Sequence, residues 1–550
     1  MNKVLENPFY YLDNFHQVLQ WISARYTDLL LDDERAFLAI FPSLPQSSRA
    51  LFVRMVMRKG EYFRASKLVY AEIGDTHAAA LPLAELGLIE TDPALTLDQL
   101  FELLQKPEIG QVFELPPAQR ALRKADQLEA LRPLHPGEQR FSSCFGKAGA
   151  RPEDHVYHIL AQPLCDRLRL IFFGNTHQDW TEFVLSDLGI YQYEKVEFPP
   201  AARGFRSRQD IDHYLELAQC QQRFANGEAL EEVLPALPTL GDDNEWLCSR
   251  RAKLLFQFAQ HAERLRDWPL AHQLYAGCAY PGARARAVRV LEKDGRHADA
   301  FSLLRLAQQA PESEAERQQL LRIAPRLARQ LGHAAPARAK PAPVRRIDLN
   351  LPPPTEPTYV EWVVREHLHR AEAPVYYVEN ALINSLFGLL CWDAVFCAIP
   401  GAFFHPFHRG PADLHSADFH QRRAPQFAAC LAQLASDGYR DTIRHNFRAK
   451  AGIQSPFVFW ETIDEELLEL ALACIPASHL ACSFERILAD VKANRSGFPD
   501  LIQFWPAEQR YTMIEVKGPG DRLQDNQLRW IDYCAEHQMP VAVCYLQWSD

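Results

Sequence analysis

Residues 511–517 alternate as a β-strand requires, because successive side chains of a strand point to opposite faces. The alternation places Glu515 and Lys517 side by side on one face, with aliphatic residues on the other. Upstream, Asp500 stands just before an apolar run at residues 501–505, and a short turn separates the two runs. A β-hairpin built from them would bring Asp500 back beside Glu515.

Two carboxylates that converge at one end of a hairpin form a site of hard oxygen ligands, which suits Mg²⁺ or Mn²⁺. Hydrolysis of a phosphodiester needs an activated water and neutralisation of charge on the phosphoryl oxygens, and a divalent ion supplies both. Lys517 would orient or deprotonate that water, or offset charge in the transition state. In the simpler interpretation, Asp500 is a turn residue, and Glu515 and Lys517 form an exposed ion pair on a strand.

The residues that follow the hairpin predict the remainder of an α/β core. A helix after residue 521 carries an apolar stripe with one polar member, Gln527, and residues 540–546 form a buried strand. This order of strand, strand, helix, strand matches restriction-endonuclease-like cores, which usually open with a helix that carries another carboxylate. Residues 378–390 predict such a helix, with Glu379 in its first turn. The same position suits an acid that only interacts with the helix dipole.

The chain resembles the Fanconi-associated nucleases, whose catalytic module is the VRR-type branch of the PD-(D/E)xK nucleases. The resemblance covers nearly the whole chain and is carried by these motifs: Gly497-Phe498-Pro499-Asp500-Leu501, Glu515-Val516-Lys517-Gly518-Pro519, Asp521-Arg522-Leu523, Glu379 with Leu386-Phe387-Gly388-Leu389-Leu390-Cys391-Trp392-Asp393, Arg422-Arg423, and Leu51-Phe52-Val53-Arg54-Met55 with Arg58-Lys59 and Lys67-Leu68. It implies a metal site made by three carboxylates and one backbone carbonyl, those of Glu379, Asp500, Glu515 and Val516. It also implies that Lys517 completes the site. We add Gln527, the polar member of the helix stripe, to the predicted catalytic residues.

The resemblance implies an enzyme that cleaves branched DNA near 5′ flaps and degrades DNA from 5′ ends, in the repair of interstrand crosslinks. Mg²⁺ or Mn²⁺ is the expected cofactor, and 5′-flap DNA is the expected partner. Eukaryotic members carry a ubiquitin-binding zinc finger ahead of this region. Its absence here predicts a compact bacterial member that works in the cytoplasm, at the nucleoid during repair.

Composition agrees with an intracellular protein of several domains. The 550 residues suggest three or four domains, and a hydrophobic content of 47% supports well-formed cores. No apolar stretch approaches the length of a membrane span, and the N-terminus has no signal-peptide pattern, so no membrane partner is expected. The 12 cysteines are scattered without a Cys-x-x-Cys motif, which predicts reduced core residues rather than zinc ligands.

We expect a multidomain, mainly α-helical protein that ends in an α/β nuclease module. The predicted regions are an N-terminal helical DNA-binding region (1–94), a SAP-like segment with an α/β connecting region (95–209), a helical region of the tetratricopeptide kind (210–331), a Pro-rich linker (332–357) and the VRR-type nuclease domain (358–550). The run at residues 168–173 reads as a strand, and residues 418–475 read as a mostly helical insertion.

The formal net charge of −11 argues against a protein that coats DNA indiscriminately, because phosphate binding is electrostatic. DNA contacts are therefore expected from local basic patches. The candidates are Arg54, Arg58, Lys59, Lys67, Arg120, Arg123, Lys124, Arg284, Arg286, Arg289, Arg440, Arg444 and Arg522. Each patch also fits the solvated face of a helix. In some members of the family a basic pocket grips a terminal 5′ phosphate, and Arg284, Arg286 and Arg289 are the candidates here.

Two other functions fit parts of the same sequence. Related small modules act as dimers on four-way junctions, so a Holliday-junction resolvase is the alternative enzyme, whereas the long N-terminal region favours a monomeric clamp. A helical-repeat adaptor for DNA repair, with a vestigial nuclease core, is the alternative from a different class. The presence of all the charged site residues argues against the adaptor.

Overall fold

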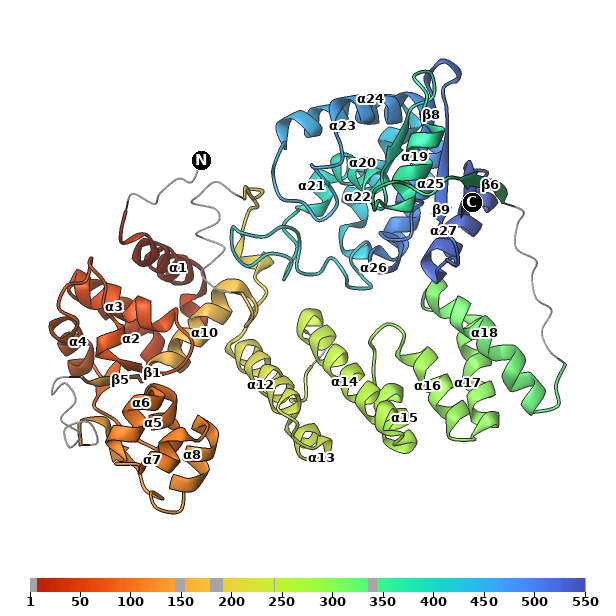
Figure 1. The fold of residues 1–550 in the computed structure, drawn as a ribbon. Helices are drawn as coiled ribbons and strands as arrows, with labels where there is room; N and C mark the ends of the chain where they lie inside the picture. The colour runs from red at the N-terminus through yellow and green to blue at the C-terminus, as the bar shows by residue number, and fades with distance from the viewer. Residues whose placement is uncertain (1–6, 144–153, 179–190, 242, 335–343, 550) are drawn as a thin grey trace. The chain divides into compact units, whose positions relative to one another are not determined.

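The computed structural model describes residues 7–143, 154–178, 191–241, 243–334 and 344–549 (Figure 1). The chain divides into two compact units, Met1–Ile190 with Phe205–Ile211 and Tyr191–Gly204 with Asp212–Asp550. Helices prevail in both, which confirms the mainly α-helical expectation. Among the described residues no single helix is long and apolar enough to cross a membrane. One pair, Glu465–Cys474 with Ala477–Ala489, passes by length and composition but is bent by 107°.

In the first unit, helices pack around a three-stranded antiparallel sheet with the order β1-β5-β2. The strands are β1 (Tyr62–Arg64), β2 (Ile89–Thr91) and β5 (Val156–Ile159), and the helices are α1 (Tyr10–Tyr26), α2 (Asp32–Ile40), α3 (Gln46–Val56), α4 (Thr76–Glu85) and α10 (Gln162–Phe173). The run at residues 168–173, predicted as a strand, is instead the end of α10. Pro163 lies in the first turn of this helix, and Gly174 ends it with a φ of 68°. A short apolar run gives no periodicity that separates a buried strand from a buried helix, which explains the error.

A second group of helices in this unit surrounds a two-stranded sheet. The elements are β3 (Ala94–Leu95), α5 (Leu97–Leu103), α6 (Lys106–Val112), α7 (Pro117–Ala121), α8 (Lys124–Leu131) and β4 (Gln139–Arg140). Thr96 and Gln99 form a capping box that starts α5, because each side chain bonds the backbone of the other. Leu100, Ile109 and Phe141 belong to a core that this group builds for itself.

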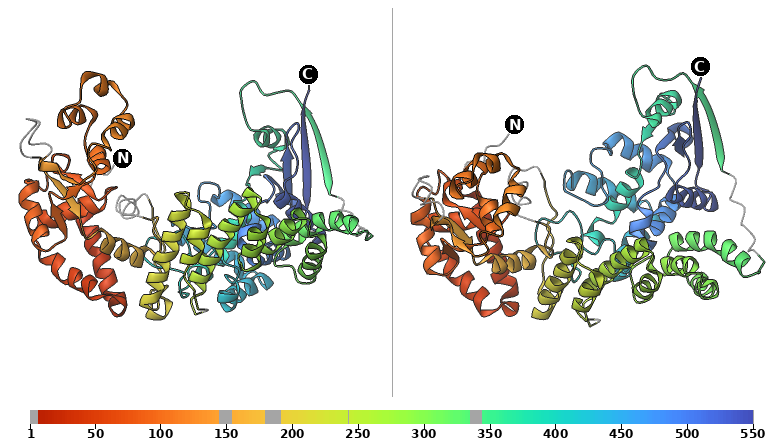
Figure 2. Two further views of the ribbon diagram at one scale, coloured as in Figure 1. Left: turned by 90° about the horizontal axis from the view of Figure 1, so that it is seen from below. Right: turned by 60° about the horizontal axis from the view of Figure 1, so that its bottom comes forward.

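The second unit contains a series of helices in which each, from α14 to α18, packs on the next (Figures 1 and 2). These are α12 (Arg208–Ala225), which starts in the first unit, and α13 (Leu230–Val233), α14 (Glu245–Leu265), α15 (Trp268–Ala276), α16 (Ala283–Lys293), α17 (His297–Gln309) and α18 (Glu314–Gln330). Asp267 caps α15 by accepting a hydrogen bond from the N–H of Leu270. The stacked helical hairpins agree with the expected tetratricopeptide-like architecture.

The nuclease module contains a five-stranded sheet with the order β6-β10-β9-β8-β7. Its strands are β6 (Arg345–Leu351), β7 (Val375–Tyr377), β8 (Leu501–Trp505), β9 (Arg510–Lys517) and β10 (Val541–Trp548). Strands β6, β10 and β9 run parallel, whereas β8 is antiparallel to both β9 and β7. The linker expected at 332–357 is therefore only partly a linker. Its residues Arg345–Leu351 pair with Ala542–Trp548 of β10 and so form the edge strand β6.

The two faces of this sheet are covered by different layers. Helix α19 (Val360–Leu368) packs its Val364 against Ile514 and Val516 on one face. A larger core on the other face includes residues of α20 (Leu382–Leu390), α25 (Ala477–Ala489) and α27 (Asp525–Glu536). The remaining helices are α21 (Trp392–Val395), α22 (Ala424–Ala432), α23 (Gly438–Ala449), α24 (Glu465–Cys474) and α26 (Val491–Asn494). The expectation of a mostly helical insertion at 418–475 is confirmed.

Candidate active site

The β8–β9 hairpin brings Asp500 and Glu515 together, as the alternation predicted. The short helix Pro506–Glu508 and Gln509, with a φ of 50°, turn the chain so that Leu501 lies opposite Ile514. Asp500 precedes β8, and its Oδ2 accepts a 2.8 Å hydrogen bond from the N–H of Val516. Its backbone carbonyl accepts another 2.8 Å bond from the N–H of Val378. Strands β7, β8 and β9 are thus tied together at the end that carries the carboxylates.

Glu515 is a fully buried carboxylate with an exposed fraction of 0%. Its Oε1 lies 2.8 Å from Nζ of Lys517, as expected for neighbours on one strand face. Neither carboxylate oxygen accepts a well-aligned hydrogen bond from the described residues. A buried carboxylate normally has its lone pairs satisfied, because burial without partners is costly. Apart from the ion pair with Lys517, the carboxylate oxygens of Glu515 thus have lone pairs available to a metal ion.

Burial and mutual repulsion raise the pKa values of both carboxyl groups. Burial raises the pKa of Glu515 well above its usual range, and the negative charge of Asp500 raises it further. Burial also raises the pKa of Asp500, against the hydrogen bond from Val516, and the charges of Glu379 and Glu361 add to the rise. Such a cluster of like charges is unfavourable alone and favours a bound cation.

Glu379 lies in the turn between β7 and α20, and not in the first turn of the helix as the sequence predicted. The turn needs a left-handed residue, which is Asn380 with a φ of 52°. The hydroxyl of Tyr377 donates a 2.6 Å hydrogen bond to Oε2 of Glu379, and Nδ2 of Asn380 donates one of 3.1 Å to Oε1. Oδ1 of Asn380 also accepts hydrogen bonds from the N–H groups of Gly497 and Phe498, at 2.7 and 3.1 Å. Asn380 thereby ties the Glu379 turn to the loop that leads to Asp500.

Three participants in this arrangement were missed in the sequence analysis, namely Asn380, Glu361 and Tyr377, whose hydroxyl holds Glu379. Asn380 carries no motif, although an asparagine beside a predicted helix start is a common left-handed residue. Glu361 stands on α19, more than a hundred residues before the hairpin, and is close enough for its charge to raise the pKa of Asp500. No local pattern signals that proximity, because it depends on how α19 packs across the sheet.

The donor set fits a hard divalent ion, although no cage is preformed. Within the part of the chain that the structure describes, no group of three or more His, Cys, Asp or Glu side chains is arranged to hold an ion as it stands. The donors near the hairpin are nevertheless all oxygens, and the lone pairs of buried Glu515 lack aligned donors. Oxygen ligands of this kind select Mg²⁺ or Mn²⁺ over softer metals.

Gln527 and Arg522 lie near the start of α27. Oε1 of Gln527 accepts a 2.8 Å hydrogen bond from the N–H of Gln524, which makes it part of the cap of the helix. Gly497 explains how closely α27 approaches the site, since a Cβ at this glycine would lie 2.8 Å from the backbone of Asn526. Arg522 is exposed in the loop before the helix.

Most of the predicted DNA-binding residues have partners within the protein. In the first unit, Arg54 pairs with Glu72 at 2.6 Å, and side-chain nitrogens of Arg58, Arg120 and Lys124 donate to backbone carbonyls, whereas Lys59, Lys67 and Arg123 are exposed. In the insertion of the nuclease module, Arg444 makes two 2.7 Å hydrogen bonds with Glu469, and Arg440 lies 3.1 Å from Asp437. The structure thus brings together the predicted catalytic carboxylates, whereas most of the predicted basic residues are engaged by partners within their own unit.

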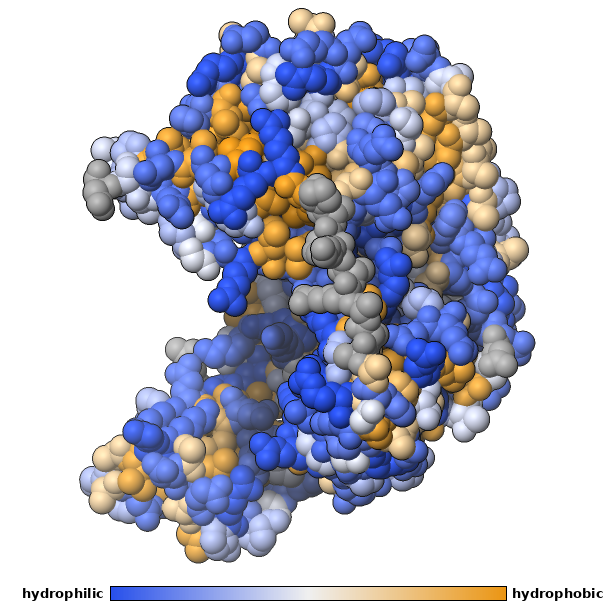
Figure 3. All heavy atoms as spheres, turned by 90° about the vertical axis from the view of Figure 1, so that its right-hand side faces the viewer, coloured by the Kyte–Doolittle hydropathy of each residue, from blue (hydrophilic) through white to orange (hydrophobic). Residues whose placement is uncertain are grey.

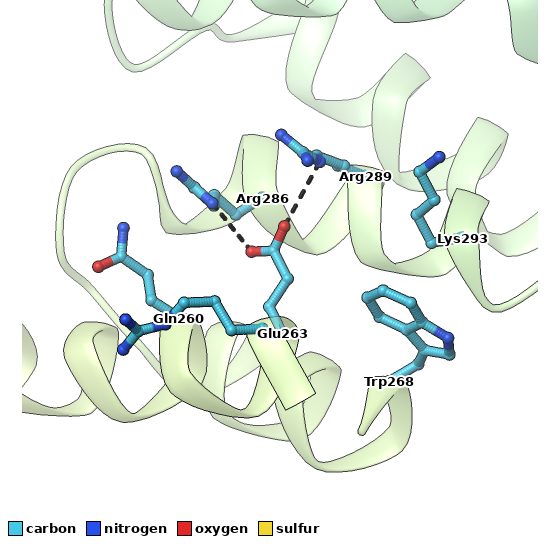
Figure 4. A pocket seen from close by; sticks show the side chains of 7 residues that line it. Gln260, Glu263, Trp268, Arg286, Arg289 and Lys293 are labelled. Atoms are coloured by element: carbon cyan, nitrogen blue, oxygen red, sulfur yellow. Dashed lines mark hydrogen bonds and ion pairs between the residues drawn. The ribbon is translucent and has the colours of Figure 1, made fainter. Parts of the chain in front are cut away.

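The three arginines of α16 point to two different places. Arg284 makes hydrogen bonds of 2.9 and 2.6 Å with the buried carboxylate of Glu316 on α18. Arg286 and Arg289 instead line a cavity of about 430 Å³ between α14 and α16, where they lie 3.0 and 3.4 Å from Glu263 (Figure 4). The other residues that line the cavity are Gln260, Arg264, Trp268 and Lys293. Four basic side chains and one acid leave this pocket with a net positive charge.

Comparison with known proteins agrees with this architecture at each level. Three domain families match consecutive parts of the chain, namely the FAN1 HTH domain at residues 9–90, the Fanconi anemia-associated nuclease SAP domain at 94–143 and the VRR-NUC domain at 435–548. The five-stranded sheet with its carboxylates and the VRR-NUC match define a nuclease of the VRR type, with an HTH domain and a SAP domain ahead of it.

Full-length relatives specify the family. The chain is 58% identical over 544 residues to the Fanconi-associated nuclease 1 homolog of Pseudomonas aeruginosa, covering 99% of this chain and 97% of the relative. The human Fanconi-associated nuclease 1 is 24% identical, over 98% of this chain and 62% of its own length. A crystal structure of paFAN1 bound to 5′-flap DNA with a gap matches the whole chain with a TM-score of 0.92 at 58% identity. The chain belongs to the Fanconi-associated nuclease 1 family, as the motifs indicated.

Proposed function

We propose that the protein is a divalent-metal-dependent nuclease that hydrolyses phosphodiester bonds near 5′ flaps of branched DNA and from 5′ ends, in the repair of interstrand crosslinks. The observation that carries the proposal is the buried Glu515 carboxylate, which lies beside Asp500 in a VRR-type module and lacks aligned hydrogen-bond donors. Support for the flap substrate comes from paFAN1, which is bound to 5′-flap DNA in its crystal structures and is 58% identical to this chain.

In this proposal Glu379, Asp500, Glu515 and the carbonyl of Val516 hold the ion, which is Mg²⁺ or Mn²⁺. When bound, the ion supplies an activated water and neutralises charge on the phosphoryl oxygens. The protein contributes the orientation of these groups. The N–H of Val516 fixes the carboxylate of Asp500, and the hydroxyl of Tyr377 fixes that of Glu379.

Lys517 is the cation of the site. Its ammonium lies 2.8 Å from Oε1 of Glu515 and is largely buried, so it is held beside the position where phosphate charge would develop. There it holds the attacking water by a hydrogen bond or offsets the negative charge of the transition state. Gln527 remains a proposed catalytic residue, although its side-chain oxygen is engaged at Gln524.

The positively charged pocket between α14 and α16 is the proposed site for a terminal 5′ phosphate. Among the residues that the structure describes, Arg286 and Arg289 share one acid, Glu263, which leaves other N–H groups of the two arginines, and Lys293, for phosphate oxygens (Figure 4). Arg284 is not part of this proposed site, because its guanidinium is hydrogen-bonded to the carboxylate of Glu316. A fixed distance between the pocket and the carboxylates would place the cut relative to the 5′ end.

The test is a comparison of the purified protein with Mn²⁺ on matched 5′-flap, 3′-flap, four-way and plain duplex DNA. The proposal expects the 5′ flap to be cut fastest, close to the junction. Preferred cutting of the four-way junction by symmetric incisions would support the resolvase. Binding without any cutting in Mn²⁺ or Mg²⁺ would support the adaptor. We also propose that the protein acts as a monomer in the cytoplasm. The predicted division into domains is kept in this proposal, except that the nuclease module starts with β6.

A further inference from the structure

Exposed aromatic side chains are confined to one part of the described structure. Among its phenylalanine, tyrosine and tryptophan residues, those that are exposed are Tyr359 (76%), Trp362 (42%), Tyr377 (37%) and Phe459 (39%). All four belong to the nuclease module, and three of them lie on α19 or on the strand beside it. Figure 3 shows apolar side chains grouped in patches within an otherwise largely hydrophilic surface. Such exposure is unfavourable unless a partner covers it.

Trp362 and Tyr377 form a stacked pair next to the proposed catalytic carboxylates. Their ring centroids are 6.2 Å apart and their planes differ by 25°. Tyr377 ends β7 opposite Leu501, the residue that follows Asp500, and its hydroxyl holds Glu379. Tyr377 therefore belongs to the short stretch of chain that positions the carboxylates, and Trp362 reaches it from α19.

The start of α19 lies against the other end of the site. A Cβ on Gly518, the residue after Lys517, would lie 3.2 Å from Cγ1 of Val360. The carboxylate of Glu361 influences Asp500, and the guanidinium of Arg365 lies 4.9 Å from the ring centre of Trp362. The ring pair thus lies close to the acids of the site, and the guanidinium beside Trp362 also bonds Glu366 and the carbonyl of Val375.

We propose that Trp362 and Tyr377 form a stacking site for one unpaired nucleobase beside the phosphodiester that is cut. This inference rests on the proposed function and specifies how its site recognises the DNA strand. A base can lie flat on an exposed aromatic ring only if it is not stacked within a duplex, and every base has a π-face, so the site selects an unpaired nucleotide without selecting its sequence. The strand beside a flap junction offers such a nucleotide, whereas an intact duplex does not.

The experiment measures single-turnover cleavage of a series of 5′-flap DNAs in which one abasic residue is moved stepwise across the cut. Wild-type protein should be slowed roughly tenfold by an abasic residue at one position, in keeping with the usual contribution of base stacking. Trp362→Leu, which keeps apolar bulk but has no π-face, should cut the intact flap about as slowly as the wild type cuts that abasic substrate. An abasic residue at the same position should not slow this variant further. Trp362→Phe should recover the sensitivity.

The matched control is Trp505→Ala, at the opposite end of β8, where the guanidinium of Arg510 covers the ring at 3.6 Å. It should retain the wild-type sensitivity. Thermal unfolding and Mn²⁺ binding of each variant verify that the fold and the carboxylates are intact. The proposal is overturned if no abasic position slows the wild type, or if Trp362→Leu keeps the full sensitivity.

The proposed function can fail separately. If the wild type does not cut flaps at all, the stacking site is judged by binding instead, with 2-aminopurine placed in the flap strand near the junction. Quenching of its fluorescence by wild type but not by Trp362→Leu supports the site. Equal quenching by both proteins overturns it.

Discussion

The N–H of Val516 donates a 2.8 Å hydrogen bond to Oδ2 of Asp500, so one residue of β9 orients the carboxylate that precedes β8. The proposed role of Val516 as a carbonyl ligand would give it two functions at one site. The bond also opposes the rise in the pKa of Asp500 that burial causes. It therefore helps to keep this carboxylate ionised in a buried position.

Replacement of Asp500 with asparagine should abolish cutting but preserve the fold. The amide oxygen can still accept the bond from Val516, whereas the charge that the ion requires is lost. Metal assistance contributes several kcal/mol to such reactions, so cleavage of a 5′ flap should fall by about 10³-fold or more. Flap binding should persist, because the substitution leaves the basic residues proposed to bind DNA unchanged. Glu508→Gln at the exposed hairpin tip is the matched control and should cut normally; near-normal cutting by Asp500→Asn would refute the site.

Lys517→Ala should separate chemistry from metal binding. Loss of the ammonium removes a group that orients water or offsets charge, and the cleavage rate should drop by roughly 10²-fold. Removal of a positive charge next to Glu515 cannot weaken its attraction for a cation, so Mn²⁺ affinity should be unchanged or higher. Titration calorimetry measures that affinity directly. Loss of Mn²⁺ binding in this variant would contradict the role assigned to Lys517.

Tyr377→Phe tests the positioning of Glu379. The variant keeps the ring that stacks on Trp362 and removes only the hydroxyl that donates to Oε2 of Glu379. Groups that orient a metal ligand typically change affinity or activity by about 10- to 100-fold when removed. Mn²⁺ affinity should fall within that range while DNA affinity stays constant. An unchanged Mn²⁺ affinity would show that Tyr377 does not position the carboxylate.

Metal affinity should rise with pH. Burial and mutual repulsion raise the pKa values of Glu515 and Asp500 in the metal-free protein, so part of the population carries protons that an ion must displace. Affinity for Mn²⁺ should therefore increase from about pH 6 to about pH 8 and level off above the raised pKa values. Calorimetry in buffers with different ionisation heats measures the protons released. Glu515→Gln should release fewer protons than the wild type when Mn²⁺ binds. Equal proton release by the two proteins would mean that Glu515 is already ionised in the metal-free protein.

The pocket between α14 and α16 should sense the 5′ phosphate. Arg289→Ala should reduce the preference for a 5′-phosphorylated over a 5′-hydroxyl flap by roughly tenfold, since a charged hydrogen bond to phosphate is lost. The measurement is the ratio of the cleavage rates on the two flaps, because a general change in activity affects both rates equally and cancels in the ratio.

Two arginines outside the pocket serve as controls for this experiment. Arg326→Ala, at an exposed position of α18, should leave the ratio unchanged. Arg284→Ala should also leave it unchanged but lower the melting temperature, because it strands the buried carboxylate of Glu316. Equal loss of preference in Arg326→Ala and Arg289→Ala would exclude a localised phosphate site.

The core of the site could be predicted because its determinants are local in sequence. A period of two placed Glu515 and Lys517 on one face, and the short turn fixed the partner of Asp500, as the register of Leu501 with Ile514 confirms. The apolar stripe of the following helix likewise predicted the buried positions Trp530, Ile531 and Cys534. These features depend on the regular geometry of strands and helices.

The remainder depends on contacts between distant segments. Glu379 follows a turn whose left-handed Asn380 is secured by the loop before Asp500, which no helix pattern reveals. Basic residues such as Arg284 and Arg444 have helical spacing typical of a DNA-binding face, yet acids on other helices pair with them. Strand β6 was hidden in a proline-rich stretch, because an edge strand is identified by its pairing partner rather than by its composition.

The most direct test of the metal site is an anomalous difference map from crystals of the protein soaked in Mn²⁺. A single strong peak should appear about 2.1 Å from the carboxylate oxygens of Asp500 and Glu515 and from the carbonyl of Val516, with Glu379 completing the set. The peak should vanish in Asp500→Asn crystals. A fully soaked crystal with no peak between β8 and β9, or with manganese bound only elsewhere, would contradict the account.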